Sequence, residues 1–193
     1  MTRKSTTSPD LLFPLSTFAS GDQRDATRAV EIPSDQMPEP YQQLLVHDSD
    51  MTSTLESHFG QPMVLRVLDK RMEADAIFRQ VLLVGEHDGV VAEFGAIRIN
   101  LACFDEVTRL DVEACRVPLG QILREHAIEY TSNPSAYLRI ESAPYIRDAF
   151  GNQSAGDLYG RKNSLSDPDG RYIAQIIEVL PWLDATKSNG KTI

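Results

Sequence analysis

The segment AIFRQVLLVGEHDGVVAEFGAIRIN, residues 76–100, decides the fold. It contains two apolar runs on either side of a short polar stretch, GEHDG, whose Asp-Gly pair is typical of a tight turn between antiparallel strands. In the first run, residues 76–84, odd and even positions are both apolar, which indicates a strand that is buried on its two faces. We therefore predict a central antiparallel hairpin over residues 76–100.

The rest of the chain supplies elements that fit around this hairpin. Further strands are predicted over 62–70 and 135–143, and two more between 157 and 181, around the turn sequence DPDG. Helices are predicted over 41–46, over 51–59 with Asp48 or Asp50 as the N-cap and Gly60 at the end, over 101–116 and from Pro118 onwards. The helix over 101–116 is expected to bury Leu101, Phe104, Val107, Leu110 and Ala114. This order predicts an α+β fold, an antiparallel β-sheet with helices packed on one face.

The chain divides into one domain and two ends. Residues 1–39 are rich in Ser, Thr, Pro and Asp, and are predicted to be an irregular N-terminal extension. This extension loosely imitates a signal peptide, but Asp10 and Pro14 interrupt its short apolar stretch. Residues 40–185 form the predicted domain, and 186–193 a C-terminal tail.

Composition and charge exclude several classes of function. The 193 residues carry a formal net charge of −9, which argues against a general nucleic-acid binder but not against an anionic small molecule held by a local arginine. No apolar run reaches the roughly 18 residues that a membrane span needs. The two cysteines form no CxxC pair and the four histidines show no metal-site spacing, so we expect no metal and a cytoplasmic protein with reduced thiols.

Two charged residues stand in apolar strand sequences. Arg79 lies in AIFRQVLLV and Glu178 in AQIIEVLP, and burial of an unpaired charge costs much free energy. A structural Arg–Glu ion pair is the plainest interpretation of this pattern. A ligand cavity is the alternative, with Arg79 offering its guanidinium to a carboxylate. Solvated strand ends are a third possibility.

Six short motifs, taken in order, resemble the chorismate pyruvate-lyase family, also called 4-hydroxybenzoate-forming chorismate lyases, and its uncharacterised relatives. They are LLVHDSDMTSTLE, IFRQVLLV, AEFGAIRIN, VPLGQIL, LYGRKNSL and AQIIEVLP, and together they span roughly residues 43–182. The resemblance implies a chorismate-lyase-like fold with a closed ligand cavity.

The resemblance also implies the site residues. Carried over by motif, the ligand contacts fall on Met51, Arg79, Leu119 and Glu178. Arg79 would bind the carboxylate of the ring, and Glu178 would lie near the 4-hydroxyl and help to move a proton, so these two are the implied catalytic residues. The segments around Met51 and Leu119 would be two helical flaps. The basic motif falls on Arg161 and Lys162, either of which would meet the enolpyruvyl carboxylate.

Together these features lead to two main hypotheses for the function. The first, implied by the resemblance, is a cofactor-independent lyase that eliminates pyruvate from chorismate to give 4-hydroxybenzoate for ubiquinone biosynthesis, or that acts on a related cyclohexadiene acid. The second is a non-catalytic, sensor-like domain of the same fold. In both, the partner is a small aromatic or cyclohexadiene carboxylate, and the oligomeric state stays open, with a monomer favoured.

Overall fold

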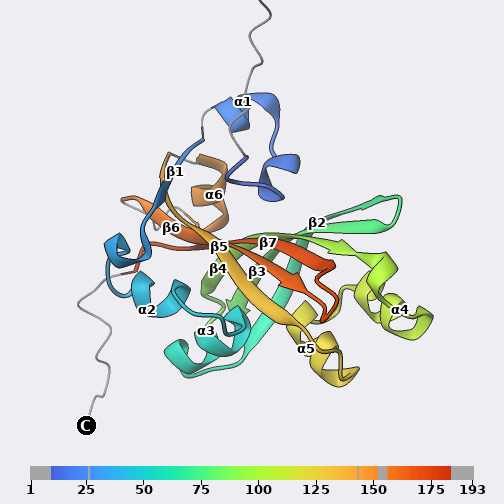
Figure 1. Cartoon of the computed structure of the whole chain (residues 1–193). Helices are drawn as coiled ribbons and strands as arrows, with labels where there is room; N and C mark the ends of the chain where they lie inside the picture. The colour runs from blue at the N-terminus through green and yellow to red at the C-terminus, as the bar shows by residue number, and fades with distance from the viewer. Residues whose placement is uncertain (1–9, 26, 143, 152–155, 184–193) are drawn as a thin grey trace, which may run out of the picture.

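A computed structural model describes residues 10–183, except 26, 143 and 152–155. In this part of the chain, seven strands form a single antiparallel sheet in the order β1-β5-β6-β7-β4-β3-β2 (Figure 1). The predicted α+β fold with an antiparallel sheet is confirmed. The strands are β1 (Arg28–Ile32), β2 (Met63–Glu73), β3 (Ala76–Gly85), β4 (Val91–Asn100), β5 (Thr131–Ser142), β6 (Leu158–Ser166) and β7 (Tyr172–Leu180).

The helices are short and fill the connections between strands. They are α1 (Gly21–Asp25), α2 (Tyr41–Leu45), α3 (Met51–Phe59), α4 (Glu106–Ala114), α5 (Leu119–Glu125) and α6 (Pro144–Ala149), with 3-10 turns η1 (Leu15–Thr17), η2 (Ser34–Gln36) and η3 (Leu101–Cys103). In Figure 1, α2, α3 and α5 lie below the sheet, whereas α1 and α6 lie above it. None of the helices in the described ranges is long and apolar enough to cross a membrane.

Strand β7 is at the centre of the sheet between β6 and β4, and β3 lies between β4 and the edge strand β2. The hairpin β3–β4 is therefore an interior part of the sheet, as its apolar sequences predict. Asp50 caps α3 by accepting a hydrogen bond from the Ser53 amide at 2.9 Å, and Gly60 ends the helix with a positive φ of 66°. This cap fixes where α3 begins. It therefore sets which residues of the helix start face the sheet.

The N-terminal segment differs from the irregular extension that composition predicts. From residue 10 onwards it folds onto the sheet through Leu12 and η1, and β1 pairs with β5 as an edge strand. Leu15 is fully buried and Leu12 is 9% exposed, both in the core that also contains Phe94 and Val179. A few well-placed leucines outweigh the polar composition, because the upper face of the sheet needs an apolar cover.

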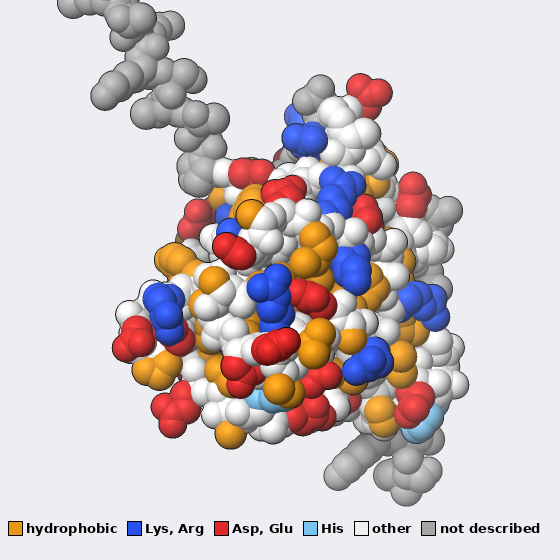
Figure 2. All heavy atoms as spheres, turned by 90° about the vertical axis from the view of Figure 1, so that its right-hand side faces the viewer, with side chains coloured by type: hydrophobic (Ala, Val, Ile, Leu, Met, Phe, Trp, Pro, Cys, Tyr) orange, Lys and Arg blue, Asp and Glu red, His pale blue; other side chains and the backbone are white. Residues whose placement is uncertain are grey.

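Helix α4 also differs from the prediction. Val107 and Leu110, expected in the core, are 65% and 62% exposed, while Thr108 and Val112 are buried. The sequence predicts one helix over residues 101–116. In the structure the chain first makes the 3-10 turn η3, and α4 begins only at Glu106, which shifts the buried face of the helix. Figure 2, which shows the side of the molecule that carries α4, has apolar side chains exposed among acidic and basic ones.

A pair of leucine substitutions tests both corrections. Leu15→Ala should lower the free energy of unfolding by about 2–5 kcal/mol, because it leaves a cavity in the core. Leu110→Ala, at an exposed position, should change it by less than about 0.5 kcal/mol. Urea unfolding followed by circular dichroism measures both, and equal effects of the two variants would contradict the burial described here.

Candidate functional site

A cavity of about 100 Å³ lies between the central strands and the first residues of α3 and α5. Met51 at the start of α3 and Leu119 at the start of α5 are 4% and 5% exposed, and both line it. The two predicted flap segments therefore form one side of the cavity. Its remaining apolar wall comes from the sheet: Leu65, Val81, Leu83, Ile97, Leu165 and Ile176.

The register of the sheet explains which side chains meet in the cavity. Gly95 pairs with Val81 on one side and with Glu178 on the other, and Glu178 pairs with Arg161 of β6. Arg79 pairs with Ile97, which follows Gly95 by two residues on β4 and so lies on the same face. Because side chains alternate between the two faces of a strand, these residues all point to the side covered by α3 and α5.

Arg79 is a buried cation whose donors are not all used by the protein. It is 1% exposed, and its Nε and Nη1 atoms have no hydrogen-bond partner among the described residues. Burial lowers the pKa of Arg79, an effect that the neighbouring Cys115 thiol partly opposes. Buried polar groups nearly always have hydrogen-bond partners. Arg79 lines the cavity, so we expect its unpaired donors to bind an anion.

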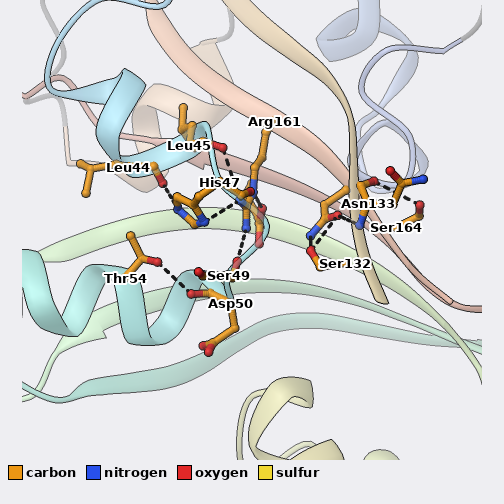
Figure 3. Close-up of polar contacts among 12 residues, drawn as sticks. Leu44, Leu45, His47, Ser49, Asp50, Thr54, Ser132, Asn133, Arg161 and Ser164 are labelled. Atoms are coloured by element: carbon orange, nitrogen blue, oxygen red, sulfur yellow. Dashed lines mark hydrogen bonds and ion pairs between the residues drawn. The ribbon is translucent and has the colours of Figure 1, made fainter. Parts of the chain in front are cut away.

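Arg161 is also buried, but each of its three side-chain nitrogens has a partner. Its Nε bonds to Glu178 Oε2, its Nη1 donates to the carbonyls of Leu45 and His47, and its Nη2 donates to the carbonyl of Ser49 (Figure 3). His47 Nδ1 lies 3.2 Å from Nη1. The ion pair with Glu178 and the three carbonyls tie β6 and β7 to the loop between α2 and α3, so Arg161 positions the start of α3.

Lys162, the other half of the predicted basic motif, does not reach the cavity. Its Nζ donates to the Asp10 carbonyl at 2.8 Å, in the N-terminal segment. Adjacent residues of a strand point to opposite faces of the sheet, so a cavity that takes Arg161 excludes Lys162. The placement of Lys162 among substrate-binding residues is therefore corrected.

Arg79 and Glu178 line the same cavity without an ion pair between them. Their strands are separated by β4, which places the two backbones roughly 10 Å apart across the sheet. In the described part of the chain, the ion-pair partner of Glu178 is Arg161. The simple structural Arg79–Glu178 pair is thus absent, and the two side chains contribute separately to the cavity.

Glu93 of β4 is a cavity residue that the sequence prediction missed. It is 5% exposed, and its Oε2 has no hydrogen-bond partner in the described ranges. Burial, together with the nearby charge of Glu178, raises the pKa of Glu93 well above its ordinary value, while Arg161 acts in the opposite direction. The signal was the same as for Glu178, a single carboxylate in the apolar strand VVAEFGAIRI.

Polar groups at the edges complete the site. Asp50 Oδ2 lies 3.4 Å from Arg124 Nη1, which links the start of α3 to α5 through a partly exposed ion pair. Asn163 lines the cavity and bonds to Ser132 and to the Asn133 amide. Nowhere in the described ranges do three His, Cys, Asp or Glu side chains gather as a metal site would require.

Solved structures with the same fold bear on the interpretation. PhnF from Mycobacterium smegmatis matches with a TM-score of 0.56 and 11% identity, over 70% of this chain and 65% of that chain. The effector domain of PhnF matches with a TM-score of 0.53 and 11% identity, over 68% of this chain and 88% of the domain. The fold is that of the PhnF effector domain.

The similarity extends to the fold and no further. A ligand-binding domain of a putative GntR-family transcriptional regulator from Bordetella bronchiseptica has a TM-score of 0.48 and 13% identity, over 61% of this chain and 85% of that one. No protein-family model and no curated protein matches the sequence. This chain spans 65% of the length of PhnF.

The raised pKa of Glu93 predicts how stability varies with pH. The folded protein holds a proton on Glu93 over a pH range in which the unfolded chain has lost it, so the free energy of unfolding falls as pH rises from about 4.5 to the folded-state pKa. The unfolding equilibrium constant should rise by up to about tenfold per pH unit in this range. Urea unfolding at successive pH values measures it.

Two variants isolate this contribution. Glu93→Gln should flatten the decline, whereas Glu86→Gln, at an exposed position of the β3–β4 turn, should leave it as in the parent protein. The same pH profile in the parent protein and Glu93→Gln would contradict a proton on Glu93.

Removal of Arg161 should destabilise the fold strongly. Arg161→Ala leaves Glu178 buried without its cation and removes the donor to the carbonyls of Leu45, His47 and Ser49, at a cost of about 3–5 kcal/mol in the free energy of unfolding. Lys162→Ala, one residue along β6, should cost less than about 1 kcal/mol. Urea unfolding compares the two variants, and a small effect of Arg161→Ala would show that the pair does not hold α3.

Proposed function

We propose that this domain binds a small monocarboxylic acid, with the ligand carboxylate on Arg79 and the ligand ring or alkyl body against the apolar wall. The observation that carries this proposal is the buried guanidinium of Arg79, which lines the cavity with unpaired Nε and Nη1 atoms. A carboxylate matches the planar donors of arginine in geometry and charge. Its binding would satisfy both the donors and the positive charge.

The charges in the cavity favour one carboxylate rather than two. Arg161 and Glu178 neutralise each other, and the raised pKa of Glu93 favours its neutral form, which leaves Arg79 as the unpaired cation. Chorismate carries two carboxylates, so its second one would lack a cation, because Arg161 is engaged and Lys162 is on the other face. An aromatic monocarboxylate places one charge on Arg79 and an uncharged ring against the walls.

The size of the cavity limits the ligand to a small molecule. Its volume of about 100 Å³ compares with roughly 150 Å³ for an apolar cavity that takes up benzene. A ligand with one six-membered ring and a carboxylate would therefore need the cavity to widen. The similarity in fold to the effector domain of PhnF agrees with a domain that binds a ligand without catalysing a reaction. It therefore favours the sensor-like hypothesis.

Chorismate lyase activity is the second candidate. It is favoured by Glu93, a buried carboxyl whose raised pKa favours the neutral form, since such a group can donate or accept a proton during an elimination. Arg79 would again hold the ring carboxylate, and Glu178 would face the hydroxyl. No cofactor is needed, because formation of the aromatic ring drives the loss of pyruvate.

Titration calorimetry with 4-hydroxybenzoate tests the first proposal. The protein should bind the acid, and Arg79→Met should weaken binding roughly thirtyfold or more, because the ligand carboxylate would be buried without a cation. Lys162→Ala is the matched control and should bind as the parent protein does. Equal affinity of Arg79→Met and the parent protein would rule out the assigned anchor.

Incubation of the protein with chorismate separates the two candidates. Formation of 4-hydroxybenzoate and pyruvate, abolished in Arg79→Met, would establish the lyase. Binding of 4-hydroxybenzoate without turnover of chorismate would establish the binding domain.

A further inference from the structure

The backbone of β4 is arranged to bring the carboxyl group of Glu93 over its neighbour Gly95. A Cβ atom at Gly95 would lie 2.8 Å from Glu93 Oε1 and 3.0 Å from the Ile177 carbonyl. The absence of a side chain at Gly95 is therefore what gives the carboxyl its place. Since Gly95 pairs with Glu178, the Glu93 carboxyl lies beside the Glu178 side chain, in the cavity that both residues line.

The hydrogen bonds of the two carboxyl groups are complementary. Glu178 Oε2 accepts a hydrogen bond from Arg161 Nε. The other oxygen, Oε1, can accept a hydrogen bond from another group. Glu93 Oε2 is buried without a partner in the described ranges, although a buried oxygen normally has one. One neutral and one ionised carboxyl side by side supply a donor and an acceptor to the same point in the cavity.

We propose that Glu93 is a specificity-determining residue, a neutral carboxylic acid that donates a hydrogen bond to a hydroxyl oxygen of the ligand while Glu178 accepts the hydrogen of that hydroxyl. This inference rests on the proposed function, with the ligand carboxylate on Arg79. It assigns the ligand class more closely, as hydroxylated cyclic monocarboxylic acids. A hydroxyl group satisfies both carboxyl groups because it donates and accepts at once.

The charged and titratable groups around the cavity are consistent with a proton on Glu93. Glu178 of β7 repels a second negative charge, and Arg161 of β6, which would attract it, is already paired with Glu178. The other ionisable side chains of the site are Arg79 on β3, Asp50 at the start of α3, His47 in the loop before it and Tyr130 before β5. Asp50 is paired with Arg124, and His47 with Arg161.

Three benzoates test the inference by calorimetry: 4-hydroxybenzoate, 4-aminobenzoate and 4-methylbenzoate. The amino group can donate to Glu178 but accepts poorly, and the methyl group does neither. The parent protein should prefer 4-hydroxybenzoate over each of the others by roughly ten- to hundredfold, the effect of a buried group left unpaired. Glu93→Leu should remove most of the preference over 4-aminobenzoate, and it should fold, because an apolar residue replaces a buried acid.

The pH dependence of binding gives a second readout. In the parent protein, affinity for 4-hydroxybenzoate should fall by up to about tenfold per pH unit above the pH at which Glu93 loses its proton. Glu93→Gln keeps a donor without a proton to lose, so its affinity should stay level over that range. Carbon-13 resonances of glutamate carboxyl groups in the ligand-free protein identify this pH, with Glu93→Gln assigning the signal and Glu86→Gln as control.

The possible failures differ from one another. Binding that depends on Arg79 but shows the same hydroxyl preference in Glu93→Leu would overturn the role of Glu93 alone. A Glu93 carboxyl that ionises near pH 4.5 in the free protein would do the same, whatever ligand binds. Absence of binding by all three acids, or equal binding by Arg79→Met, would overturn the proposed function and this inference with it.

Discussion

The buried pair of Arg161 and Glu178 is the interaction on which the site depends. It joins strands β6 and β7 to the end of α2 and the loop before α3, because the guanidinium that meets the carboxylate also donates to the carbonyls of Leu45, His47 and Ser49. A buried ion pair seldom adds stability beyond that of an apolar replacement, but loss of one partner is costly. Its value here is geometric, since it places Met51 over the cavity and leaves Arg79 as the cation with open donors.

The different roles of Arg161, which pairs with protein groups, and Arg79, which keeps unpaired donors, explain the charge of the cavity. Arg161 satisfies the protein's own carbonyls and carboxylate, whereas Arg79 has nothing comparable on its strand. Burial, and after it the negative charge of Glu178 in the same small space, raises the pKa of Glu93 and favours its neutral form. The net positive charge that remains is small and local, within a protein whose overall charge is −9.

The sequence predicts the sheet well because strand signals here are local. Apolar runs and turn residues mark β3, β4, β6 and β7, and a charge in such a run marks Arg79 and Glu178. It predicts the partners poorly, because register decides them: the pairing of β6 with β7 joins Glu178 to Arg161 and sends Lys162 to the opposite face. The folded N-terminal segment and the buried face of α4 depend on contacts between distant residues, which composition and periodicity do not contain.

The ion pair between Asp50 and Arg124 has a consequence for how a ligand exchanges. It links two helix starts at the surface, and a pair exposed to this degree contributes at most about 1 kcal/mol. Helix α5 is held mainly by Leu119, Ile122 and Leu123, which are 5%, 1% and 0% exposed, so its movement would expose apolar surface that costs far more than the ion pair. Burial therefore dominates the barrier to ligand exchange, and dissolved salt, which screens the link, should change the time a bound molecule stays only slightly.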